Sequence, residues 1–217
     1  MSDTDSFIEE VSEEVRRDKM YGYLRRYGWI GILLVVGIVG GAAYNEYNKA
    51  SQRNAAQARG DAILAALDND DASARQSALA AIEGDGRASA VVALLTSAEA
   101  LAADDPSAAS AALQDIIDDT SHSQIYRDMA VLKQAILNAD GTSPADRIAS
   151  LETLASPGGA FRVLAEEQIA LAQIEAGETD AAITRLQGLL QDNEASASLR
   201  RRVTQLIVAL GAEPDLG

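Results

Sequence analysis

The chain contains no cysteine, one histidine and only nine aromatic residues among its 217 positions. Without cysteine it has no disulfide bonds, no thiol nucleophile and no thiolate ligands for zinc. The histidine, His122, has no second histidine with which to bind a metal, and the serines on either side of it are typical of a loop. We therefore expect His122 to be exposed to solvent between two helices.

Motifs of common catalytic sites are also missing from the sequence. It contains no phosphate-binding loop, no nucleophile elbow and no HExxH pair. The acidic run Asp68–Asp71 begins like a calcium-binding loop, but Ala72 takes the fifth ligand position, and neither the glycine nor the closing glutamate follows. We expect a protein with no catalytic residues, no cofactor and no bound metal.

Positive charge is scarce, with 18 basic against 33 acidic residues and a net charge of −15. The first 26 residues carry five basic and seven acidic side chains, so most of the excess lies in the remainder, which carries 13 basic and 26 acidic ones. A domain this acidic is repelled by nucleic-acid backbones and by anionic headgroups. Nucleic acid is therefore disfavoured as a partner.

One long apolar run stands out against this composition. Tyr27–Asn45 has nineteen residues without a charge. As a helix it would span roughly 28 Å, close to the ~30 Å hydrocarbon core of a bilayer. Aromatic rings, which prefer the headgroup level, lie at both ends: Tyr27, Trp29, Tyr44 and Tyr47. We predict one transmembrane helix over residues 27–47, in contact with the lipid bilayer.

Basic residues flank this run unequally, and the inequality predicts its orientation. Arg16, Arg17, Lys19, Arg25 and Arg26 precede it, whereas Lys49, Arg53 and Arg59 follow it. Because basic flanks favour the cytoplasm, residues 1–26 are predicted to be a cytoplasmic segment and the larger domain to lie outside the cytoplasm. A cleaved signal peptide, cut near Gly41–Ala43, is the alternative. It would need an unusually long, acidic n-region and a longer apolar run than signal peptides have.

Two glycines give this helix a candidate contact face. Gly37 and Gly41 form a GxxxG pair, and small residues let helix backbones approach closely in lipid. Background glycine, which is common in transmembrane helices, is the alternative explanation. The pair makes membrane helix packing, including a homo-oligomer, a hypothesis.

Beyond residues 48–84, predicted as a leading helical hairpin, residues 85–217 repeat with a period of 35. Each of three units predicts helix, turn and helix: 87–103 with 107–118, 122–138 with 144–155, and 159–176 with 179–192. Six columns of equivalent residues define the period: Val91, Tyr126 and Phe161; Leu94, Met129 and Leu164; Ala100, Ala135 and Ala170; Leu101, Ile136 and Leu171; Leu113, Ile148 and Ile183; and Ile116, Leu151 and Leu186.

The turns between these helices contain suitable capping residues. Pro106 and Pro144 suit the first helical position, with Asp105 and Ser143 before them as caps. Gly177 is predicted to end one helix and Thr179 to cap the next, while Ala197–Leu210 predicts a closing helix. The outer face of that helix is expected to be exposed to water, with Arg200, Arg201 and Arg202 on it.

A helix pair about every 34 residues is the tetratricopeptide signature. Leu164–Gln191 resembles that motif best, with Ala170 and Ala182 in the small positions and Gly177 in the turn. We therefore predict an all-α fold, in which a single N-terminal transmembrane helix precedes a TPR-like helical-hairpin solenoid. In such arrays the first helices line a concave surface that binds proteins.

Ordinary tetratricopeptide geometry also predicts two contact residues. Glu167 and Glu175 would point into the groove of the last full unit, as candidate contacts for a partner protein.

The layout resembles one bacterial family, the YfgM-like ancillary subunits of the SecYEG translocon. The resemblance is most specific at the junction, in Arg25–Trp29 and in Tyr44–Tyr47, which opens a long polar and alanine-rich helix. It implies a bitopic protein of the bacterial inner membrane with a periplasmic TPR-like domain. By the same resemblance, its partners are the SecYEG translocon and a membrane-anchored parvulin-like chaperone, and it has no catalytic residues.

The sequence therefore predicts a scaffold that holds a chaperone near the translocon exit and assists exported proteins. A cytoplasm-facing TPR scaffold for envelope assembly is one alternative. A structural homo-oligomer of the envelope, associating through Gly37 and Gly41, is the other.

Overall fold

The structure, a computed structural model, describes residues 3–84, 86–138 and 141–215, with the backbone alone for residues 3–19, 23 and 24. Within these residues it contains helices and no strands, which confirms the predicted all-α class. The chain divides into two units, Met1–Ala58 and Arg59–Gly217. The domain boundaries predicted after residues 26, 47 and 84 stay predictions.

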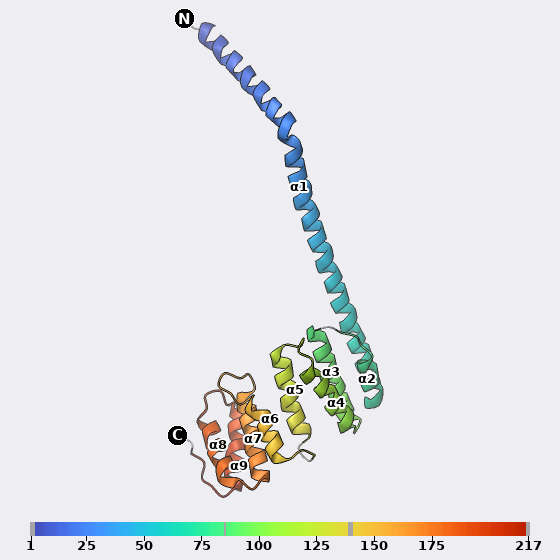
Figure 1. The fold of residues 1–217 in the computed structure, drawn as a ribbon, viewed down its shortest axis with the longest axis vertical. Coiled ribbons are helices and arrows are strands. Elements are labelled where there is room, and N and C mark those ends of the chain that lie inside the picture. The colour runs from blue at the N-terminus through green and yellow to red at the C-terminus, as the bar shows by residue number, and fades with distance from the viewer. Residues whose placement is uncertain (1–2, 85, 139–140, 216–217) are drawn as a thin grey trace. The chain divides into compact units, whose positions relative to one another are not determined.

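The first helix, α1, runs from Asp3 to Leu67 (Figure 1). Within Arg25–Leu67 an 18-residue window has a mean hydropathy of 1.8, and none of that window is buried in the structure. Large apolar side chains such as Ile32, Val36 and Val39 are exposed. The helix is long and apolar enough to cross a membrane, and lipid would remove these side chains from water.

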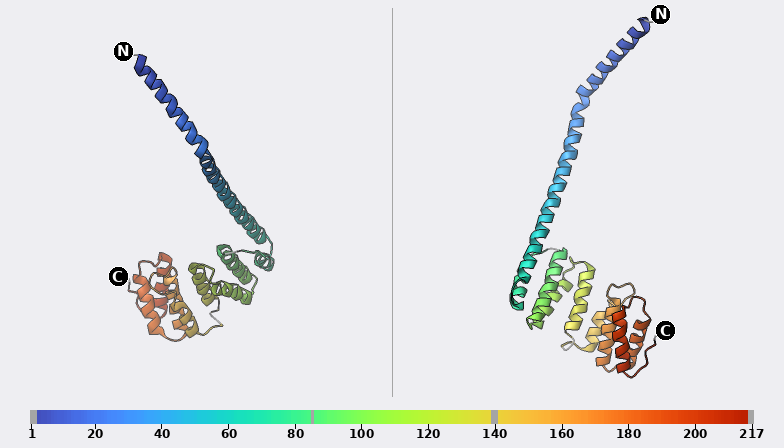
Figure 2. Two further views of the ribbon diagram at one scale, coloured as in Figure 1. Left: turned by 45° about the horizontal axis from the view of Figure 1, so that its top comes forward. Right: turned by 180° about the vertical axis from the view of Figure 1, so that it is seen from behind.

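The helices of the second unit follow one another as the period of 35 predicts. Consecutive helices from α2 to α9 pack against each other, and the views in Figures 1 and 2 agree on this order. Their ends lie within three residues of the predicted ones. The helices are α2 (Ala72–Ala80), α3 (Gly86–Ala102), α4 (Pro106–Asp118), α5 (Gln124–Leu137), α6 (Pro144–Glu152), α7 (Arg162–Glu175), α8 (Thr179–Gln191) and α9 (Ala197–Ala209).

Three apolar clusters hold the second unit together. They join α3, α4 and α5 around Leu113 and Ile116, then α5, α6 and α7 around Leu151 and Ile169, then α7, α8 and α9 around Leu186. Because each cluster shares a helix with the next, the apolar core runs through consecutive helices. Each helix is therefore held by its neighbours in the chain, as repeat proteins require.

The turn residues behave largely as predicted. Pro106 and Pro144 each begin a helix, and the backbone N–H groups of the next turn donate to the side chains of Asp105 and Ser143. Gly177 ends α7 with φ at +79°, in the left-handed region that favours glycine. The prediction for Thr179 is wrong: it is the first residue of α8, so it lies inside the helix it was expected to cap.

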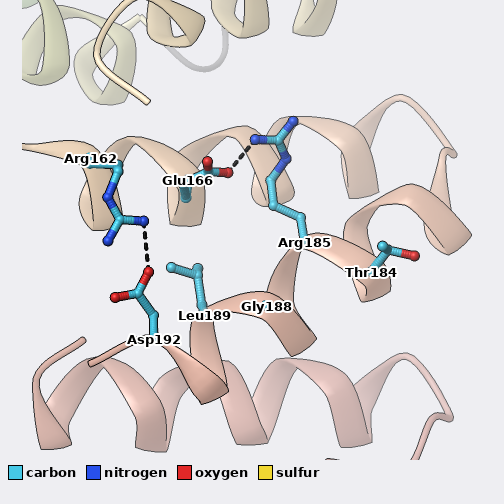
Figure 3. A pocket seen from close by; sticks show the side chains of 7 residues that line it. All are labelled: Arg162, Glu166, Thr184, Arg185, Gly188, Leu189 and Asp192. Atoms are coloured by element: carbon cyan, nitrogen blue, oxygen red, sulfur yellow. Dashed lines mark hydrogen bonds and ion pairs between the residues drawn. The ribbon is translucent and has the colours of Figure 1, made fainter. Parts of the chain in front are cut away.

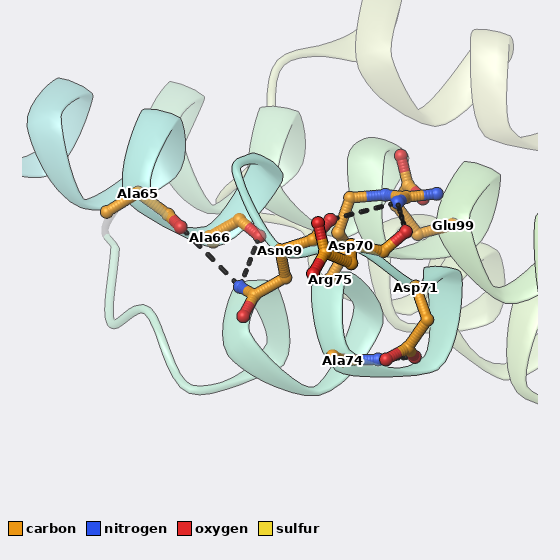
Figure 4. Close-up of polar contacts among 8 residues, drawn as sticks. All are labelled: Ala65, Ala66, Asn69, Asp70, Asp71, Ala74, Arg75 and Glu99. Carbon is orange, nitrogen blue, oxygen red and sulfur yellow. Dashed lines mark hydrogen bonds and ion pairs between the residues drawn. The ribbon is translucent and has the colours of Figure 1, made fainter.

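The acidic run at residues 68–71 forms the connection between α1 and α2 (Figure 4). The carboxylate of Asp71 accepts a hydrogen bond of 2.7 Å from the backbone N–H of Ala74, and so caps α2. Arg75 donates to the backbone carbonyls of Asn69 and Asp70 and, at 2.6 Å, to the carboxylate of Glu99 on α3. These contacts give the run a structural role.

Candidate partner-binding surface on the first helices

One of the six repeat columns lies on the surface. Leu101, Ile136 and Leu171 occupy equivalent positions on α3, α5 and α7, the first helices of the three units, and they are 47 %, 50 % and 37 % exposed. We call these three residues the first-helix row. The residues just before Leu101 and Leu171, Ala100 and Ala170, are fully buried. A repeated exposed apolar position is therefore not part of the packing between helices.

A further exposed apolar residue, Leu164, extends the surface of the first-helix row along α7. Leu164 precedes Leu171 by seven residues, or two helical turns, and is itself 39 % exposed. At the far end of the array the equivalent of the row is Leu206 on α9, which packs against the cluster of α7, α8 and α9. Among the described residues, the exposed part of this column is thus confined to the three first helices, where a partner can cover it.

Glu167, one of the two predicted groove residues, lies in an ion pair within the array. Its side chain is 7 % exposed, and both carboxylate oxygens accept hydrogen bonds, of 2.8 and 2.7 Å, from the guanidinium of Arg202 on α9. The hydrogen bonds that Arg202 donates to the Glu167 carboxylate raise the pKa of Arg202 above its usual value. Arg202, expected to be free in solvent on the outer face of α9, is 51 % exposed but holds this carboxylate.

Glu175, the second predicted groove residue, is 50 % exposed at the end of α7 and forms an ion pair with the buried Arg147 of α6. Both predicted glutamates therefore have partners within the chain. Their role as contacts for another protein stays a prediction. Sequence patterns gave no signal for either pair, because the partners are 35 and 28 residues apart.

A network of ion pairs lines a pocket of about 270 Å³ beside α7 and α8 (Figure 3). Arg162 donates to Asp192 and Glu194, both at 2.7 Å, and Arg185 donates to Glu166 and to Glu152. Hydrogen bonds from Arg162 hold the pKa of Asp192 below its usual value, and those to Asp192 and Glu194 raise that of Arg162. The ion pairs of Arg162 and Arg185 therefore join α7 to α8, and Arg185 also joins α8 to α6.

His122 corrects an expectation from the sequence. It is only 6 % exposed, and its Nδ1 lies 3.0 Å from the backbone carbonyl oxygen of Gly86, at the start of α3. Its Nε2 lies 3.5 Å from a carboxylate oxygen of Asp119, and its own carbonyl accepts a hydrogen bond from Arg127. The loop between α4 and α5 is thereby attached to α3 through a buried histidine.

The remaining predicted site residues, Gly37 and Gly41, lie on the apolar part of α1. Apart from the adjoining backbone of α1, a methyl group added at either would meet no atom within 4 Å. The face is open, and its role in helix packing stays a prediction. Among the described residues, no group of three or more His, Cys, Asp or Glu side chains is placed to hold a metal ion.

Comparison with known proteins identifies the family. The model of the tetratricopeptide repeat-like domain matches residues 22–207, which is most of the chain. The chain therefore belongs to the tetratricopeptide repeat-like domain family, whose fold is generally a non-enzymatic scaffold for protein–protein interaction. No curated protein and no solved structure matches it.

Proposed function

We propose that this protein is a non-enzymatic, membrane-anchored scaffold that binds a partner protein on the first-helix row. The observation that carries the proposal is the exposure of Leu101, Ile136 and Leu171 at one repeated position, although Ala100 and Ala170 beside it are buried. Fully burying a leucine or isoleucine side chain contributes about 1.5–3 kcal/mol. Three half-exposed ones give a partner a modest but useful apolar contact.

The anchor gives this weak surface a location. A bitopic helix over residues 27–47 would hold the repeats, stacked as a solenoid, at one membrane and raise their effective concentration toward partners there. The unequal basic flanks and the resemblance to the YfgM-like family favour the bacterial inner membrane, with the repeats in the periplasm. By the same resemblance the partners are the SecYEG translocon and a membrane-anchored parvulin-like chaperone, and the client proteins are exported chains.

Photo-crosslinking in native membranes tests this function. A photoreactive amino acid replaces Ile136 in the first-helix row, or Val208, which is 58 % exposed on α9 and outside the row. We expect the Ile136 probe to yield discrete adducts containing translocon subunits or the parvulin-like chaperone, and the Val208 probe to yield far fewer. The identity of the adducts separates the alternatives.

Adducts with cytoplasmic envelope-assembly proteins would show that the repeats lie in the cytoplasm, opposite to the proposed orientation. Adducts with a second copy of the chain, dominant over all others, would favour the structural homo-oligomer through Gly37 and Gly41. Equal adduct patterns from Ile136 and Val208 would show that the first-helix row is not the binding surface.

A further inference from the structure

The segment after α9 turns back onto α8. Gly211, with φ at +81°, ends α9, and the N–H of Ala212 donates to the carbonyl of Ile207 at 3.1 Å, which is a helix C-cap that reverses the chain. Ala212 packs against the cluster of α7, α8 and α9. Residues 213–215 have no helical or strand structure and contact two glutamines of α8.

The first glutamine, Gln187, bonds to the backbone on both sides of Pro214. Its Nε2 donates to the carbonyl oxygen of Glu213 at 2.7 Å, and its Oε1 accepts from the backbone N–H of Asp215 at 2.8 Å. In an extended chain a carbonyl and the N–H two residues later point to the same side. The side-chain amide of Gln187 therefore donates one hydrogen bond and accepts another, as the backbone N–H and C=O of a residue in a neighbouring strand do in a sheet.

The second glutamine, Gln191, lies one turn further along α8 and donates to the carboxylate of Asp215 at 2.9 Å. Four residues of helix rise about 6 Å, and two residues of extended chain rise about 6.6 Å. Gln187 and Gln191 therefore match the spacing of an extended segment. Pro214 suits the middle position because it has no N–H to leave unbonded and its φ is already restricted.

We propose that Gln187 and Gln191 form a clamp for an extended polypeptide segment of a partner protein. In this clamp, Gln187 binds a backbone carbonyl and the backbone N–H two residues later. Gln191 binds the acidic side chain of the residue that carries this N–H. Residues 213–215 occupy it as an intramolecular competitor. The hydrogen bonds of the clamp are solvent-exposed, so the tail can exchange with another segment of the same chemistry.

The tail also sets a threshold for partner binding. A short tether holds a ligand at an effective concentration of the order of millimolar. A free segment must therefore bind more tightly than the tail, or be held close by other contacts. This clamp lies on α8, a second helix, so it is separate from the first-helix row.

Binding of a peptide to the membrane-anchored chain in detergent micelles, with and without residues 213–217, tests the clamp. The probe is a fluorescent, N-acetylated peptide with the sequence of residues 212–217, followed by fluorescence polarisation. The receptor is the chain ending at Ala212, which retains the α9 cap and the packing of Ala212. We expect this chain to bind the peptide at least tenfold more tightly than the chain that retains residues 213–217, in which these residues compete.

Variants of the shortened chain supply the controls. Gln187→Ala removes two of the three hydrogen bonds and should weaken peptide binding about tenfold or more. Gln57→Ala, an exposed glutamine of α1, should leave binding unchanged. Circular dichroism verifies that each variant keeps its helical content.

Three outcomes would overturn the proposal. The peptide fails to bind the shortened chain at millimolar concentration, or it binds the Gln187→Ala variant equally well. In the third, the chain that retains residues 213–217 forms a dimer that is lost when they are removed, which would assign the clamp to exchange of these residues between copies.

Discussion

Arg202 shows how a residue on an exposed helix face can carry an internal contact. Its guanidinium is 51 % exposed, yet it satisfies both oxygens of Glu167, whose side chain is 7 % exposed. A buried carboxylate without a partner is costly, because its desolvation is no longer offset. Arg202 therefore stabilises the packing of α9 on α7 as well as facing solvent.

Replacing Arg202 tests this contact against a neighbouring arginine. Arg202→Met should lower the free energy of unfolding by about 1–2 kcal/mol, at the lower end because solvent screens half of the guanidinium. Arg201→Met, at the exposed position beside it, should change it by less than about 0.5 kcal/mol. Urea unfolding followed by circular dichroism measures both. Equal midpoints for the two variants would contradict the role given to Arg202.

The ionisation of Asp192 makes the stability of the fold depend on pH in the acid range. Its pKa in the folded chain is lowered from the ordinary 3.8, chiefly by the hydrogen bond from Arg162 and then by the backbone N–H of Glu194. A lowered pKa means that the stabilisation is fully present above the unfolded value and is lost as the pH falls through the folded one. The chain should therefore lose stability below about pH 4.

The Asp192→Asn variant checks the source of this loss. It should be less stable than the parent chain at pH 7, and its free energy of unfolding should fall less steeply between pH 5 and pH 3. Thermal unfolding across that range gives the comparison. An acid slope equal to that of the parent chain would remove Asp192 as its source.

Single residues are also where the sequence was least informative. His122 lies between two serines and looks like a loop residue, but it is buried because Gly86, 36 residues earlier, offers it a carbonyl oxygen. The partners of Glu167 and Glu175 are also far away in the sequence, at 35 and 28 residues. Such contacts depend on how one repeat packs on the next, and no local pattern records that.

At the scale of helices, local rules were sufficient for most of the fold. Pro106 and Pro144, with their capping residues, and Gly177 fixed helix ends that the structure confirms. The period of 35 gave the helix pairs and their order. It did not separate the buried Ala170 from the exposed Leu171, because both recur at that period and only the packed array distinguishes their faces.

Two glycines of the same helix pair should respond oppositely to alanine. Gly177→Ala places a side chain at φ +79° and should destabilise the protein by about 1 kcal/mol. Gly188→Ala lies inside α8 with open space around the added methyl group, and should stabilise it by about 0.5–1 kcal/mol. Thermal unfolding of both variants measures the difference. Shifts in the same direction would contradict these backbone roles.

At the scale of the whole molecule, one family covers both the apolar helix and the repeats. The matched residues, 22–207, begin before Tyr27 and end within α9. The exposed apolar part of α1 and the exposed first-helix row are both surfaces that the chain itself leaves uncovered. We propose that lipid covers the first and a partner protein the second.

The most direct test of this account is co-purification of partners from native membranes with altered first-helix rows. The double variant Ile136→Lys and Leu171→Lys should lose most of the co-purified protein, because two charges replace the apolar contact, while its thermal stability changes little. Val208→Lys, at an exposed position of α9 outside the row, should retain it. Undiminished co-purification with the double variant, or an equal loss with Val208→Lys, would contradict partner binding on the first-helix row.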